Sequence, residues 1–133
     1  MVEDEKVESF IHEHIGCSFV EIERFFEQNK WLRESPDGME FSLATTELGK
    51  RNIIFWATKN EELADCIGRL MTSKRILIRP CPVLTYGLDG KILGFPIATR
   101  LMQYKTTHWL PVVVNTIGYI AVEGYLQRKY GTK

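Results

Sequence analysis

Residues 74–93 read KRILIRPCPVLTYGLDGKIL and contain the pattern on which the expected fold depends. Two apolar runs, 83–88 within this stretch and 91–95 across its end, are separated by Asp89 and Gly90. An Asp-Gly pair tolerates positive φ at both turn positions and is typical of a type I′ two-residue turn between antiparallel strands. The stretch therefore predicts a β-hairpin.

Three further runs predict strands. RILIR at 75–79 has the composition of a short strand, and Pro80 and Pro82 after it remove two backbone donors, which favours an exposed edge or a bend. NIIFWA at 52–57 and LPVVVN at 110–115 are continuous apolar runs rich in β-branched or aromatic residues. Both are expected to be buried strands, because a strand covered on two faces loses the alternation of apolar and polar residues.

Apolar residues at helical spacing predict three helices in the first half of the chain, at 3–15, 19–28 and 60–72. Gly16 suits the left-handed position that follows a helix, and it ends the first one. A helix, a short turn containing Gly and a second helix form the opening of a helix-turn-helix motif.

Two capping boxes mark the expected starts of the later helices. Ser18 with Glu21 precedes the second helix, and Thr58 with Glu61 precedes the third. In a capping box each side chain accepts from a backbone N–H that the first helical turn leaves unpaired.

The remaining segments have weaker patterns. Residues 30–59 contain a turn at Pro36-Asp37-Gly38 and little periodicity before the strand at 52–57, so a long loop with short extended pieces is expected. Residues 117–130 have an apolar stripe that predicts a C-terminal helix. All of this fits one domain spanning residues 1–133, since the chain is too short for two ordinary domains.

The charge of the chain is unevenly distributed along the sequence. Residues 1–66 contain 15 Asp and Glu against 7 Lys and Arg, whereas residues 67–133 contain 2 against 10, so a net charge of zero hides an acidic and a basic half. A basic C-terminal face would attract an anionic partner. The same asymmetry also suits ion pairs within a monomer or a head-to-tail dimer.

No catalytic or metal-binding motif stands out. The sequence has no P-loop, GxGxxG, GxSxG or HExxH motif. His12, His14 and Cys17 are spaced so that they point to different sides of a helix, and Cys81 with His108 is only a lone thiol and a lone imidazole. We therefore expect a protein that is not an enzyme and binds neither a metal nor a cofactor.

The sequence also indicates a cellular compartment. Three distant cysteines without a CxxC pair argue against a disulfide framework and against a zinc finger. The first residues are acidic and lack the apolar region of a signal peptide, and no apolar run is long enough to span a membrane. A cytoplasmic protein that does not enter a membrane is expected.

Two segments of the sequence, together with the predicted hairpin, resemble a known superfamily. HIGCSFVEIERFFEQN, followed by NEELADCIGRLMTSKRILIR and the Asp-Gly hairpin, resembles a winged helix-turn-helix DNA-binding domain over about residues 4–95. The resemblance implies an α+β, winged-helix-like fold: three N-terminal helices, a small antiparallel sheet with a hairpin wing, and then a C-terminal strand and helix. Residues 30–59 would be a long insertion in the 1–95 winged-helix-like part. Residues 96–133 would be a C-terminal extension, whose helix either forms a homodimer or packs on the sheet of its own chain.

The same resemblance implies a regulatory protein that binds double-stranded DNA. The wing and the basic half would contact phosphates, which position a protein on DNA without reading its sequence. The expected nucleic-acid-binding residues are Arg69, Lys74, Arg75, Arg79, Tyr86 and Lys91. Two features have another reading: cations on a sheet edge also block edge-to-edge aggregation, and Glu61, Glu62 and Asp65 suit a helix N-terminus but would repel phosphate.

An alternative function remains open from the sequence. A module of the same fold could bind another protein through the acidic third helix or through aromatic residues, without contacting DNA. The two functions differ in surface potential, because DNA binding needs the third helix and the hairpin to share a positive face.

Overall fold

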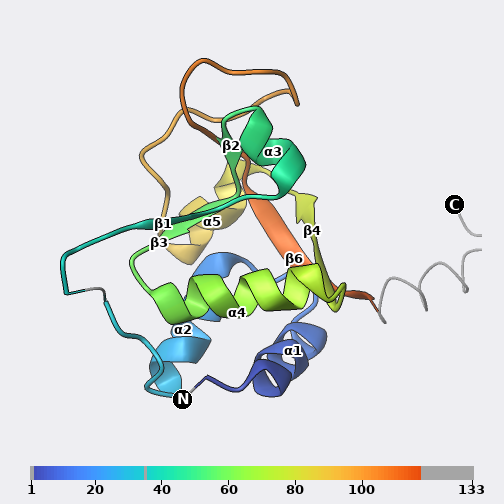
Figure 1. Cartoon of the computed structure of the whole chain (residues 1–133). Helices are drawn as coiled ribbons and strands as arrows, with labels where there is room; N and C mark the ends of the chain where they lie inside the picture. Colours follow the sequence, from blue (N-terminus) through green and yellow to red (C-terminus); the bar gives the residue numbers. More distant parts are fainter. Residues whose placement is uncertain (1, 35, 118–133) are drawn as a thin grey trace, which may run out of the picture.

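The computed structural model describes residues 2–34 and 36–117, which form a mixed α+β fold (Figure 1). The helices in these residues are α1 (Asp4–Glu13), α2 (Phe19–Gln28), α3 (Thr46–Lys50), α4 (Glu61–Thr72) and α5 (Val83–Asp89). The strands are β1 (Phe41–Leu43), β2 (Ile53–Ile54), β3 (Trp56–Thr58), β4 (Ile76–Pro80), β5 (His108–Trp109) and β6 (Val112–Thr116). They pair in twos: β1 with β3 and β4 with β6 antiparallel, and β2 with β5 parallel.

The two N-terminal helices are confirmed, with α2 at the predicted bounds. Ser18 accepts from the backbone N–H of Glu21 while Glu21 accepts from the backbone N–H of Ser18, so the predicted capping box is present. Gly16 has a φ of 80° in the turn between the helices, where a side chain would be strained. The turn is also tied to β6, because the Gly16 N–H donates to Val114 O at 3.0 Å.

The third predicted helix is confirmed as α4, but its cap is not the predicted one. Asn60 is the N-cap residue, and its side chain accepts from the backbone N–H of Glu62 at 3.1 Å. Thr58 instead accepts from the N–H of Asn60 at 3.1 Å. Thr58 belongs to β3, so its backbone is still in the strand ladder and the helix begins after the next polar residue.

The predicted strand at 52–57 is buried but divided into two. β2 pairs with β5 and β3 pairs with β1, and the change of partner occurs at Phe55, whose N–H donates to Leu43 O at 2.8 Å. Trp56 and Trp109, both fully buried, meet in the core with ring centroids 6.1 Å apart. The predicted strands at 75–79 and 110–115 are confirmed as β4 and β6.

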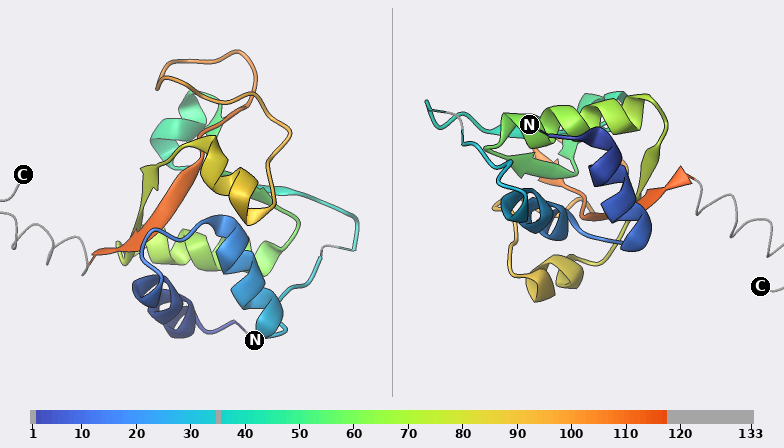
Figure 2. Two further views of the ribbon diagram at one scale, coloured as in Figure 1. Left: turned by 180° about the vertical axis from the view of Figure 1, so that it is seen from behind. Right: turned by 90° about the horizontal axis from the view of Figure 1, so that it is seen from below.

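The paired strands lie between helices α4 and α5. In both views of Figure 2, α4 covers one side of the strands and α5 lies on the other side. α1 packs near β6 and α4, and α2 packs near α5. The core therefore continues from α4 through the strands to the inner face of α5.

The predicted hairpin is wrong. Residues 83–89 form helix α5, and no strand lies between this helix and β5 in the described chain. Gly90 has a φ of 99°, and the N–H groups of Gly90 and Lys91 both donate to Tyr86 O, as at the end of a helix. An Asp-Gly pair serves a helix C-terminus as well as a hairpin, because both need a residue at positive φ. The buried Tyr86 decides the outcome here, since its hydroxyl donates to Val112 O at 2.6 Å.

The segment at 30–59 is more ordered than expected. It contains the predicted turn near Gly38 and a short extended piece, β1, but also helix α3, which was not predicted. α3 is only five residues long, and its Thr45 cap gives little signal against a polar background. The predicted C-terminal helix at 117–130 lies outside the described residues beyond 117, as does any dimer contact made through it. No helix in the described part of the chain is long and apolar enough to cross a membrane.

Candidate functional site

Two of the expected DNA-contacting arginines pair with carboxylates of α1. Arg69 makes a two-pronged contact with Asp4, with Nε and Nη2 at 2.8 and 2.9 Å from the two oxygens. Arg75 donates to Glu8 Oε1 at 2.8 Å. Hydrogen bonding to Arg69 lowers the pKa of Asp4, and hydrogen bonding to Asp4 raises the pKa of Arg69. Both pairs join the acidic and basic halves of the chain, so these arginines are already neutralised.

Two other expected contact residues face inward or into a groove. Tyr86 is fully buried: its hydroxyl donates to Val112 O and accepts from the N–H of Phe19 at 3.1 Å. Burial also raises the pKa of this hydroxyl. Lys91 pairs with Glu23, with Nζ 3.2 Å from Oε1. Tyr86 therefore holds α5 to the core and presents no surface to a phosphate.

Lys74 and Arg79 remain as exposed cations; Lys74 lies two residues before β4, and Arg79 lies within it. Neither makes an ion pair with another described residue. The six expected residues thus do not form one patch: two lie on the seam with α1, one is buried, one lies in a groove and two lie in or just before β4.

The outer face of α5 presents an apolar surface that was not predicted. We call it the α5 ridge, and its residues are Val83, Leu84, Leu88 and Ile92. Leu84, Leu88 and Ile92 are 65%, 78% and 58% exposed, the highest values among the large apolar side chains of the described residues. Ile92 folds back over the helix, since its Cδ1 lies 3.6 Å from where a Cβ on Gly87 would be. The four-residue spacing of the two leucines is the sequence signal for this face, but the Asp-Gly pair after them predicts a strand there instead.

The ridge is held by polar contacts at its C-terminal end. Ser18 Oγ donates to Asp89 Oδ2 at 2.5 Å, and the guanidinium of Arg24 donates to Asp89 O. These contacts link the end of α5 to α2, so the ridge is presented on a helix that is fixed at both its buried face and its end.

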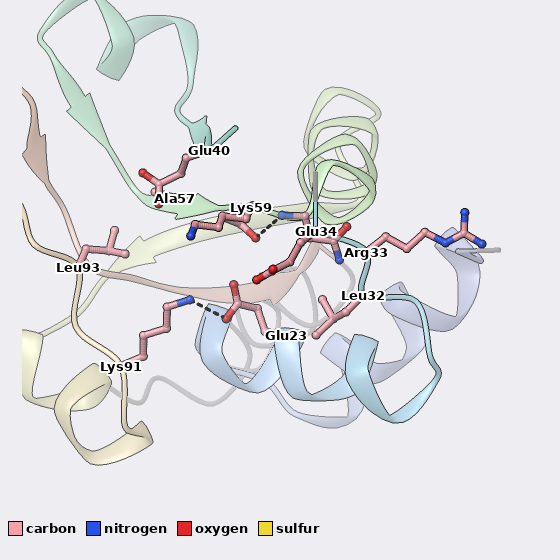
Figure 3. Close-up of a pocket in the computed structure, with 11 residues that line it drawn as sticks. Glu23, Leu32, Arg33, Glu34, Glu40, Ala57, Lys59, Lys91 and Leu93 are labelled. Carbon is pink, nitrogen blue, oxygen red and sulfur yellow. Dashed lines mark hydrogen bonds and ion pairs between the residues drawn. The ribbon is translucent and has the colours of Figure 1, made fainter. Parts of the chain in front are cut away.

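A groove of about 390 Å³ is lined by Lys91 and Leu93, the two chain neighbours of the ridge residue Ile92 (Figure 3). Lys91 and Leu93 form one wall, Lys59 and Glu34 lie across from them, and Glu23 lies between. Glu23 is fixed there, because Trp56 Nε1 donates to its Oε2 at 3.0 Å.

The thiols and imidazoles do not form a reactive cluster. Burial raises the pKa of Cys17 to about 12 and also raises that of Cys66 and Cys81, so these thiols are protonated at neutral pH and are poor nucleophiles. His12 Nδ1 lies 3.0 Å from Thr116 Oγ1, and His108 stacks on Tyr104. Within residues 2–34 and 36–117, no three His, Cys, Asp or Glu side chains are grouped as metal ligands.

Comparisons with known proteins give no match: no family model fits the sequence, and no curated protein or solved structure is similar to it. The features of this chain that bear on function are therefore the α5 ridge, the groove and the paired charges.

Proposed function

We propose that this protein is a protein-interaction module that inserts the α5 ridge into an apolar groove of a partner protein. The exposure of Leu84 and Leu88 on α5, with the exposed Ile92 folded back over the same helix, carries the proposal. Contiguous exposed apolar side chains of this kind mark interaction sites more often than chance. Leucines at i and i+4 on a helix match the anchors used when a helix binds in a groove.

The shape and size of the ridge favour a concave partner over a second copy. The ridge is one short helix and one following residue, whereas a stable protein–protein interface buries about 800 Å² on each side. A convex helix gains most when a partner surrounds it, because anchor residues bind strongly only where water is excluded from them. The partner is therefore expected to supply the groove and most of the polar rim.

A pull-down with matched variants tests this function. Leu84→Gln with Leu88→Gln removes the apolar surface while keeping helix propensity, and Leu101→Gln makes the same change at a 57% exposed leucine in the loop beside α3. We expect the wild type and Leu101→Gln to retain at least one protein in similar amounts. The double variant should retain about tenfold less of it, or none. Retention that is the same for all three chains would contradict the proposal.

DNA binding through exposed cations in and near β4, without a hairpin wing, is the second candidate. The observation in its favour is that Lys74 and Arg79 are exposed and have no ion-pair partner among the described residues. Arg69 and Arg75 would have to leave Asp4 and Glu8 to contribute. This makes a weak, salt-dependent contact the expected form of such binding.

A gel-shift assay separates this candidate from the first. Random duplex DNA at about 50 and 200 mM salt should show a steep salt dependence if phosphates are bound. Lys74→Glu with Arg79→Glu should then abolish the shift, and Leu84→Gln with Leu88→Gln should leave it unchanged. A shift that survives the charge reversal would exclude β4 as the DNA contact.

A further inference from the structure

The groove beside the α5 ridge contains a lysine of the chain itself in a well-defined setting. Lys91 Nζ lies 3.2 Å from Glu23 Oε1 and 5.2 Å from the ring centroid of Trp56. The other carboxylate oxygen of Glu23 accepts from the indole N–H of Trp56 at 3.0 Å. Figure 3 shows the Lys91 side chain reaching from its wall toward Glu23.

We propose that Glu23 and Trp56 form a binding site for a lysine side chain of a partner protein, and that Lys91 occupies this site until the partner displaces it. The inference rests on the proposed function, because the partner that covers the α5 ridge brings the lysine. The site is a recognition site for a primary alkylammonium group, with the chain's own lysine as its internal ligand.

The chemistry of the site is specific for such a cation. A carboxylate and an aromatic ring attract an ammonium group together, and a charge-assisted hydrogen bond adds direction. The indole N–H fixes the orientation of Glu23, so its second oxygen stays directed at the cation. Leu93 and Ala57 line the same groove and supply apolar surface for a lysine stem.

Lys91 is held weakly enough to be displaced. Its side chain is 47% exposed, and an exposed ion pair contributes little because both charges remain solvated. The groove of about 390 Å³ is open to solvent and extends beyond Lys91 to Lys59 and Glu34. A second ammonium group therefore has access to Glu23 without unfolding of the groove. It reaches the ring of Trp56, which is fully buried while Lys91 lies over it, only when Lys91 has left.

The site and the ridge are adjacent in the chain. Lys91 reaches into the groove, whereas Ile92, the next residue, packs over Gly87 as part of the ridge. A partner that covers Leu88 and Ile92 therefore borders the groove. A basic side chain of that partner needs to extend only past residues 91–93 to enter the groove.

The test uses a small probe and needs no partner protein. The probe is n-butylammonium, which is the end of a lysine side chain, and n-butanol at matched ionic strength is its neutral control. Binding is followed by the indole N–H resonances in a two-dimensional NMR spectrum, in which Trp56 is identified by its shift in Glu23→Gln. The chains are the wild type, Glu23→Gln, Lys91→Ala, and Lys91→Ala with Glu23→Gln.

In Lys91→Ala, butylammonium should shift the Trp56 indole resonance, and butanol should not. The wild type should bind about tenfold more weakly, because the probe must displace Lys91 from an exposed ion pair and a ring contact. The double variant should not respond. The inference is overturned if the probe leaves Trp56 unchanged in Lys91→Ala, if Glu23→Gln has no effect, or if butanol acts equally. Such a result leaves the pull-down test of the ridge unaffected, so the two failures are distinguishable.

Discussion

Paired charges cover the seam between α1 and α4, whereas unpaired apolar side chains cover the outer face of α5. At the seam, Arg69 and Arg75 each find a carboxylate within the chain. On the α5 ridge, Leu84 and Leu88 have no comparable partner and remain exposed. The difference indicates where a partner would bind. The charges of the seam are already paired within the described chain, whereas covering the apolar ridge would lower the free energy by removing it from water.

The inner face of α5 provides the largest expected effect, because the ridge exists only while Tyr86 holds this helix. Tyr86→Phe leaves the N–H of Phe19 and the carbonyl of Val112 without their partner. Two buried groups left unpaired should lower the free energy of unfolding by about 2–3 kcal/mol. Urea denaturation measures this. A loss below about 0.5 kcal/mol would mean that α5 is not anchored by this hydroxyl.

The end of α5 can be tested by replacing two glycines with alanine, because the two changes should affect stability in opposite ways. Gly90 has a φ of 99° and an added Cβ would meet nothing closer than Arg24 Nη2 at 3.8 Å, so Gly90→Ala should cost about 1 kcal/mol through backbone strain alone. Gly87 lies within the helix, and Gly87→Ala should be neutral or stabilising by up to about 1 kcal/mol. Thermal or urea unfolding of the pair gives the comparison. Equal effects at both positions would argue against a helix that ends at Gly90.

The sequence predicted the N-terminal helices better than it predicted α5. Ser18 with Glu21, Gly16 and the apolar stripes define α1 and α2 through contacts only a few residues apart, and these helices are found as expected. α5 was assigned wrongly, because its fate depends on the contact from Tyr86 to Val112, which joins distant parts of the chain. Local patterns report local contacts, and an Asp-Gly pair fits both outcomes.

The candidate site was predicted even less completely. The charge asymmetry was correct as composition, but the sequence does not show that Asp4 meets Arg69 or that Glu23 meets Lys91, since each pair is more than sixty residues apart. An unpaired cation and a paired one look the same in a sequence. The ridge was missed for a related reason: exposure follows from which face of α5 the buried tyrosine selects.

The seam itself should show a smaller and pH-dependent effect. Asp4→Asn removes the two-pronged contact with Arg69, and we expect a loss of up to about 1 kcal/mol at about pH 7, since the pair is partly solvated. Because the folded pKa of Asp4 is lowered from 3.8, its contribution is present above that value and is lost as the pH falls through the folded pKa. The difference between wild type and variant, measured by urea denaturation, should therefore shrink as the pH falls below 3.8. Glu5→Gln, a neighbouring carboxylate with no ion pair in the described chain, is the control and should show no such trend.

The smallest expected effect on stability is at the α5 ridge. This prediction separates the ridge most clearly from the seam, where the side chains are paired within the chain. Leu84→Gln with Leu88→Gln exchanges exposed apolar side chains for polar ones of similar helix propensity, so the free energy of unfolding should change by less than about 0.5 kcal/mol. Urea denaturation of the double variant beside Leu101→Gln checks this. A loss of about 2 kcal/mol or more would mean that the two leucines are already packed inside the folded chain. If the free energy of unfolding is unchanged and partner retention is lost, the two leucines contribute to binding and not to folding.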